Sequence, residues 1–167
     1  MSTVHSPRHP DALDMLEADH RALEQLFDAF DRAGAAAPEH KQSLVQRACE
    51  LLTIHAIVEE ELLYPMAQDA LAAQGNIDVD EAYVEHFLMT SLIDRLASLT
   101  AGEDGFDATF RMLKEHAGRH VAEEETTLFP ELRRAQLDLV TLGARMDARR
   151  NALRGRIDET AMTALPH

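Results

Sequence analysis

The sequence contains a single cysteine, Cys49, no tryptophan and only 5% aromatic residues. One cysteine excludes an internal disulfide and any cysteine-rich zinc or iron–sulfur site within one chain, and we expect Cys49 to be a buried small thiol. The scarcity of aromatic residues and of β-branched runs favours helix over sheet. No run approaches the roughly 18 consecutive apolar residues of a membrane span, so no membrane partner is expected.

Basic residues are also scarce, since 16 Lys and Arg stand against 30 Asp and Glu, for a formal net charge of −14. Such a surface repels phosphate backbones, and we expect no nucleic acid partner. Residues 131–167 differ from the rest, with seven arginines and five acidic residues. This contrast predicts either that the C-terminal segment docks on the acidic remainder or that two faces are solvated. The first 20 residues lack the apolar core of a secretory signal, so we expect a cytoplasmic protein.

Apolar residues recur at helical spacing in five stretches, separated by short breaks rich in glycine, proline or polar residues. The 167 residues suit one compact domain. We therefore predict an all-α fold, in which an up-down-up-down four-helix bundle is followed by an additional C-terminal helix. The predicted parts are a loose arm at residues 1–10, the bundle at 11–130 and an amphipathic helix at 131–167.

Two features of these helices are predicted in more detail. Pro65 should end or kink the second helix, whose last piece runs to Ala73 before a break at residues 74–78. The C-terminal helix carries an apolar stripe with a spacing of seven residues, which would pack on the bundle or on a second copy of the chain as a homodimer. The stripe consists of Leu132, Leu139, Met146 and Leu153.

An internal repeat is the most specific signal in the sequence. His55-Ala-Ile-Val-Glu59 recurs 65 residues later as His120-Val-Ala-Glu-Glu124, and an aromatic residue and a proline follow each copy at the same offsets. Residues four apart lie one turn apart on the same face of a helix. Each copy can therefore present an imidazole and a carboxylate to one spot.

Two further histidines, His20 and His86, lie 66 residues apart, and each follows an acidic residue. In antiparallel hairpins His20 lies at about the height of His55, and His86 at about the height of His120, because both members of each pair are about equally far from the intervening turn. Carboxylates near an apolar stripe are costly to bury alone, and a pair of metal ions would remove that cost. Imidazole and carboxylate together suit iron, zinc or manganese.

These motifs resemble those of the hemerythrin-like proteins with the HHE cation-binding domain, over about residues 11–130. The resemblance implies a four-helix bundle with a non-haem centre of two iron ions, for which zinc or manganese are the alternatives. It also implies four terminal ligands and two bridging carboxylates. In this sequence the implied terminal ligands are His20, His55, His86 and His120, and the implied bridging carboxylates are Glu59 and Glu124.

The sequence departs from the oxygen-carrying members at Thr90, four residues after His86, where those proteins have another histidine. Two side chains are possible replacements: His116, one turn before His120, and Tyr83, one turn before His86. His116 is equally a candidate for a surface residue, and Tyr83 for a core residue. The acidic neighbours of the paired glutamates are expected to form a solvated face. They are Glu60, Glu61, Glu123 and Glu125.

Three functions are consistent with this set of residues. The first is a di-iron protein that binds oxygen or nitric oxide for sensing, iron handling or detoxification. The second is a di-iron enzyme, either an oxidase that consumes peroxide or oxygen or a protein that repairs iron–sulfur clusters. The third is a non-redox interaction scaffold stapled by zinc. No catalytic residue is evident in the sequence, which leaves open whether the chain is an enzyme but favours a binding protein.

Overall fold

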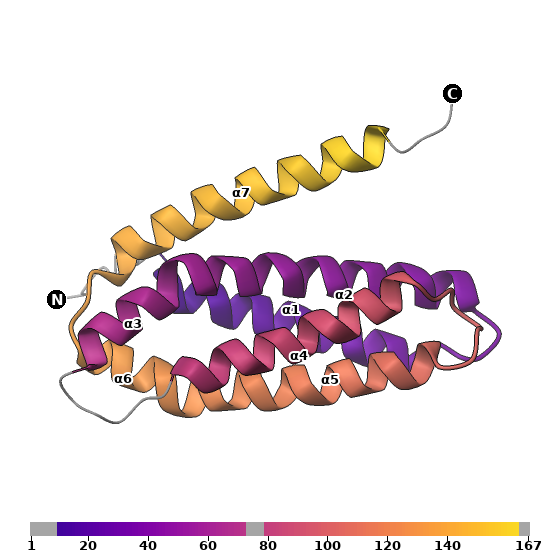
Figure 1. Ribbon diagram of the computed structural model, residues 1–167, viewed down its shortest axis with the longest axis horizontal. Helices are drawn as coiled ribbons and strands as arrows, with labels where there is room; N and C mark the ends of the chain where they lie inside the picture. The colour runs from indigo at the N-terminus through magenta and orange to yellow at the C-terminus, as the bar shows by residue number, and fades with distance from the viewer. Residues whose placement is uncertain (1–9, 73–78, 164–167) are drawn as a thin grey trace, which may run out of the picture.

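The computed structural model describes residues 10–72 and 79–163, without the side chains of 160–163. Four long helices lie side by side as a bundle, and no strand occurs among the described residues (Figure 1). The four helices are α1 Ala12–Arg32, α2 Pro38–Val58, α4 Val79–Ala97 and α5 Phe106–Glu123. Successive helices run in opposite directions, which confirms the predicted all-α, up-down-up-down arrangement.

The second and fourth long helices each continue into a short extension. Each extension begins with a five-residue π-helical turn, and a short α-helix follows. The bounds are η1 Glu59–Leu63 with α3 Tyr64–Leu71, and η2 Glu124–Leu128 with α6 Phe129–Arg134. As predicted, the helix bends near Pro65, and α3 leaves the line of α2 (Figure 1). The break predicted at 74–78 lies outside the described residues.

The additional helix is α7, Leu139–Thr163, which lies outside the bundle along α1 and α2 (Figure 1). It begins later than predicted, because a turn with Gln136 at a φ of +54° separates it from α6. Leu132 therefore belongs to α6, although it shares the spacing of the stripe. The stripe residues of α7 are buried against the bundle of the same chain, and Leu142 is buried beside them. The three stripe residues are Leu139, Met146 and Leu153.

The core consists of two apolar clusters, one toward each end of the bundle. The first contains Leu16, Val58 and Phe129, and the second contains Leu23 and Phe110. On α1 the buried His20 lies between Leu16 of the first cluster and Leu23 of the second. A polar layer therefore crosses the bundle with apolar packing on either side of it, where water is excluded.

The fold bears on the expectations for the single cysteine and for membrane-spanning segments. Cys49 is half-buried beside the second cluster rather than fully buried, and burial raises the pKa of its thiol to about 11. A thiol with so high a pKa is a weak nucleophile at neutral pH. Within the described ranges, no helix combines the length and the apolar character that are needed to cross a membrane.

Candidate metal centre

The polar layer of the bundle contains all six side chains that the repeat singled out. His20, His55, His86 and His120 lie on the four long helices, one on each, and the two glutamates are the first residues of η1 and η2. All six are buried, with at most 3% of each residue exposed. The regular rise of the helices brings His20 level with His55 and His86 level with His120, as the distances from the turns predicted.

Pro65 and Pro130 account for both π-helical turns. A proline has no N–H, and its ring clashes with the carbonyl four residues earlier, so an ordinary α-helical turn cannot run through it. The wider turn is closed instead by bonds over five residues, since the N–H of Tyr64 donates to the carbonyl of Glu59 and that of Phe129 to Glu124. Such turns are rare and recur at functional sites.

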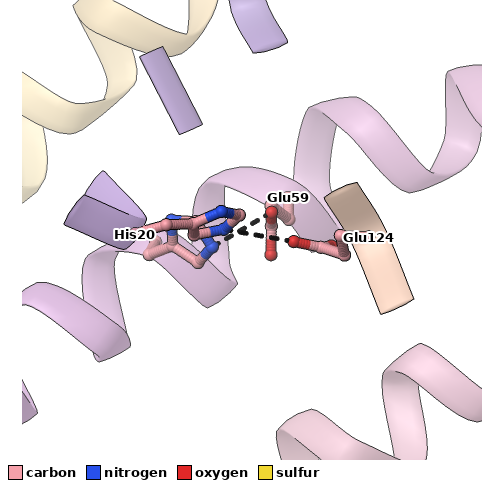
Figure 2. A group of neighbouring side chains, drawn as sticks. His20, Glu59 and Glu124 are labelled. Atoms are coloured by element: carbon pink, nitrogen blue, oxygen red, sulfur yellow. Dashed lines mark ion pairs between the residues drawn. The ribbon is translucent and has the colours of Figure 1, made fainter. Parts of the chain in front are cut away.

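The first ligand group combines His20, His55, Glu59 and Glu124, whose candidate ligand atoms lie within 4.8 Å of one another. Nε2 of His55 is 3.1 Å from Oε1 of Glu59, and Nε2 of His20 is 3.3 Å from Oε2 of Glu124. Figure 2 shows His20 and the two carboxylates directed toward one another. All four atoms are buried, yet none has a hydrogen bond. Because buried polar atoms nearly always have a partner, four orphaned atoms that converge on one point fit a cation.

The second ligand group combines Glu59, His86 and His120, and it shares Glu59 with the first group. Oε2 of Glu59 is 3.3 Å from Nε2 of His86 and 3.9 Å from Nε2 of His120. Oε1 of Glu124 is 3.5 Å from the same atom of His120. Each glutamate thus directs one oxygen toward each pair of histidines.

The hydroxyl of Tyr64 lies beside the second group, although the sequence pattern did not identify it. Its hydroxyl is 3.0 Å from Oε1 of Glu124, 3.1 Å from Nε2 of His86 and 3.3 Å from Oε2 of Glu59. An ordinary α-helix would turn a residue five positions after Glu59 away by about 140°. The π-helical turn restores it to the same side. The available signal was the tyrosine followed by proline at a fixed offset in the repeat.

Each of the four histidines has its other ring nitrogen, Nδ1, next to a carboxylate. The pairs are His20 with Glu125 at 2.7 Å, His55 with Asp19 at 3.3 Å, His86 with Glu60 at 2.9 Å and His120 with Glu85 at 2.7 Å. A carboxylate on Nδ1 fixes the ring and leaves Nε2 free to bind a metal. The prediction that Glu60 and Glu125 are merely solvated is therefore wrong. Each crosses to a histidine of the other hairpin.

Two of the four histidines, His55 and His120, have pKa values that their carboxylate neighbours raise. Burial by itself lowers the pKa of His55, but Glu59 and the hydrogen bond to Asp19 outweigh burial and raise that pKa to about 10. Burial by itself also lowers the pKa of His120, but the surrounding carboxylates outweigh burial and raise that pKa well above its ordinary value. For Glu59 burial raises the pKa, but His55 and His120 hold it well below the usual range. Metal ions would therefore have to displace protons from His55 and His120 in order to bind.

Of the two possible replacements for the missing histidine, His116 belongs to neither ligand group. His116 is half-buried on α5, and its Nδ1 accepts a hydrogen bond from Arg119 at 2.9 Å. Tyr83 is half-buried, and its ring packs edge-on against the ring of Tyr64 with centroids 5.2 Å apart. Thr90 is exposed on α4. The extra oxygen near the cluster therefore comes from Tyr64 and not from the third helix of the bundle.

Comparison with known proteins gives three similarities. The family model of the hemerythrin HHE cation-binding domain matches residues 11–164. A crystal structure of a "Hemerythrin HHE cation binding domain-containing protein: Rv2633c homolog from Mycobacterium kansasii" has a TM-score of 0.76 and 23% identity, and the match covers 92% of this chain and 93% of that one. At this identity the likeness concerns the fold.

The third similarity is to a DNA nickase of Nostoc sp. (strain PCC 7120 / SAG 25.82 / UTEX 2576). It is 29% identical over 120 residues, which are 72% of this chain and 33% of the nickase. The chain thus spans about a third of the length of this relative, and nickase activity is not assigned to it on this basis.

Proposed function

Because this chain belongs to the family of hemerythrin HHE cation-binding domains, we propose that its buried histidine and glutamate cluster binds two iron ions. The observation that carries the proposal is the sharing of two carboxylates between two pairs of histidines, with four orphaned buried atoms in the first group. A single ion would not require a second pair of histidines at the far oxygens of both carboxylates.

The ligands divide into two positions. Position one would be held by His20 and His55, and position two by His86, His120 and Tyr64. Glu59 and Glu124 would contribute one oxygen to each position. The two positions therefore differ by the phenol oxygen of Tyr64.

The donor set is the reason for proposing iron rather than zinc. Position one offers four protein donors, which would saturate a tetrahedral zinc ion but leave places open on a six-coordinate metal. An ionised phenol is a hard donor that suits iron or manganese. Iron bound here would supply reversible binding of oxygen or nitric oxide and one-electron redox chemistry, from which a role in sensing or detoxification follows.

The remaining residues of the layer hold and protect these ligands. The four carboxylates on the Nδ1 atoms fix the rings, so that each Nε2 points inward. The apolar clusters on both sides exclude water, which strengthens the attraction between the carboxylates and a cation. Access for a ligand is thereby restricted to small molecules.

The test is metal binding by the full chain under anaerobic conditions. We expect about two Fe(II) per chain and a visible absorption that appears on exposure to oxygen or nitric oxide. His55→Ala should lose at least half of the iron, whereas His116→Ala, which changes a histidine outside both groups, should bind as the wild type does. A wild-type chain that binds zinc tightly but remains colourless and unresponsive with iron would contradict the proposal and favour the zinc-stapled scaffold.

A second candidate function is an enzyme that reduces peroxide or oxygen. The observation that favours it is the hydroxyl of Tyr64, a proton donor within 3.1 Å of His86 and 3.0 Å of Glu124. Burial and the two carboxylates raise the pKa of Tyr64, so the phenol is protonated in the metal-free protein. Sustained consumption of peroxide by the iron-loaded chain, reduced in Tyr64→Phe, would support this function. A single stoichiometric oxidation event would exclude it.

A further inference from the structure

We propose that the C-terminal helix α7 is a positioning element for one of the two metal positions, with Arg150 acting through Asp19 on His55. The inference rests on the proposed function, because it concerns the affinity of position one. It adds a role for α7, a helix outside the bundle whose described residues belong to neither ligand group.

The contact between α7 and the histidine layer is direct. Nη2 of Arg150 donates to Oδ2 of Asp19 at 2.5 Å, and the same oxygen is 3.3 Å from Nδ1 of His55. The Arg150 and Asp19 side chains are only 12% and 9% exposed. A charged pair with so little solvent around it is weakly screened and directional. Arg150 therefore holds the carboxylate that orients the His55 ring.

Two further contacts fix α7 in the register that this link requires. Arg149 makes two hydrogen bonds to the carboxylate of Glu61, at 2.6 and 2.8 Å, and Glu61 lies in η1 two residues after Glu59. Gly143 lies against the start of α1, where an added Cβ would be 2.9 Å from the backbone nitrogen of Ala12. Only glycine allows this approach without moving one of the two backbones.

Position two lacks a comparable link. Its histidine His120 is held by Glu85, whose neighbour is Arg119 on α5 at 3.8 Å, with an Arg119 side chain that is 54% exposed. The other, His86, is held by Glu60, which is 40% exposed. Neither of these carboxylates is paired with an arginine of α7 in the described contacts. The influence of α7 should therefore be confined to position one.

The experiment compares stepwise zinc binding, measured by calorimetry, in the full-length wild type and in Arg150→Met. We expect affinity for one of the two equivalents to fall roughly tenfold, the lower end of the effect of outer carboxylate partners, and the other to stay within about twofold. Arg150→Lys should restore part of the loss. The matched control is Arg145→Met, which removes an exposed arginine of the same helix.

A second measurement separates positioning from a general loosening of the fold. In the zinc-loaded chain labelled with ¹⁵N-histidine, Arg150→Met should shift one Nδ1–H signal, and Glu85→Gln should shift a different one. Gly143→Ala, which displaces α7 without removing an arginine, should shift the same signal as Arg150→Met.

Three outcomes would overturn the inference. They are wild-type affinity for both equivalents in Arg150→Met, an equal loss at both, and signals that shift together in all four histidines. A wild type that binds neither zinc nor iron would instead refute the proposed function itself.

Discussion

The two helical hairpins of the bundle repeat the same pattern of histidines and glutamates, but they differ in the aromatic residue that follows the His-x-x-x-Glu pair. In both, an acidic residue precedes a histidine on the first helix, and His-x-x-x-Glu ends the second. The copies cross over, because Tyr64 of the first hairpin reaches His86 of the second, whereas Phe129 of the second stacks on His20 of the first. The Tyr64 hydroxyl is thus the chemical difference between the aromatic residues of the two halves.

This difference shows how a duplicated frame becomes an asymmetric site. Phe129 lies parallel to His20, with an interplanar angle of 5° and centroids 5.8 Å apart, and it offers only packing. Tyr64 occupies the corresponding place with a polar oxygen. The first half, in turn, has an outer partner that the second lacks, since α7 reaches it through Arg150. In the proposed centre, position two would have the additional donor Tyr64, and position one would have Arg150 of α7 as an outer partner.

The largest effect is expected from removing a carboxylate that both halves share. Glu59→Ala should lower affinity for both metal ions by more than about 100-fold, since direct ligands contribute more than the outer partners do. Metal content after dialysis would measure it, with Glu123→Ala, an exposed glutamate on α5, as the control. Loss of only one ion would show that the halves do not share Glu59.

Replacing the aromatic residue of one half with the type found in the other would make the halves alike at this position. Tyr64→Phe should weaken position two by more than about 10-fold and leave position one nearly unchanged, because it removes a direct donor beside one group only. In the metal-free chain the lost hydrogen bond to Glu124 should cost about 1 to 3 kcal/mol of unfolding free energy. Phe129→Tyr should have no such loss and could add a donor to position one. Equal metal affinities in wild type and Tyr64→Phe would contradict a ligand role for Tyr64.

The crossed carboxylates offer a paired test of smaller size. Glu60→Gln should weaken position two through His86, and Glu125→Gln should weaken position one through His20, each by roughly 10-fold. The histidine affected lies in the other hairpin in both cases. If each substitution affected the histidine of its own hairpin instead, the crossing seen in the structure would be refuted.

A separate effect concerns the pH dependence of the metal-free chain. The folded pKa of His55 is about 10, against an ordinary 6.5, so its stabilisation is complete below about pH 6.5 and is lost as the pH rises through about 10. The unfolding free energy should fall over this range by at most about 1.4 kcal/mol per pH unit for this proton. The lowered pKa of Glu59 acts in the opposite direction, with stability lost as the pH falls below about 4.5.

Urea denaturation at pH 6.5, 8 and 10 would measure this dependence in both halves. His55→Gln and His120→Gln should each remove part of the decline, because both histidines have raised pKa values. A metal-loaded chain should show little decline, since bound cations replace the protons. A metal-free chain whose stability does not change between pH 6.5 and 10 would contradict the protonated state of the layer.

Much of the candidate centre follows from local regularity. The rise of an α-helix is constant, so distances from the turns bring His20 to the level of His55 and His86 to the level of His120. The spacing of four residues in each His-x-x-x-Glu pair likewise brings both side chains to one face. These six residues were predicted because only the period of the helix was needed to place them.

Tyr64 was not predicted because the period itself changes at Pro65. Five residues at α-helical spacing turn a side chain away, and the π-helical turn returns it to the site. Glu60 and Glu125 were misjudged for a different reason. Whether an acidic residue next to a ligand is solvated or binds a histidine depends on which helix lies beside it, and those partners are 26 and 105 residues away.

The sequence by itself determined the four-helix frame, the level of its polar layer and the six side chains within that layer. Each of these depends on helical period and turn position, which act over a few residues. Tertiary structure alone decided that Tyr64 lies beside the second group, that the outer carboxylates cross between hairpins, and that Arg150 of α7 reaches Asp19. These features depend on contacts between helices far apart in the sequence, for which no short-range pattern exists.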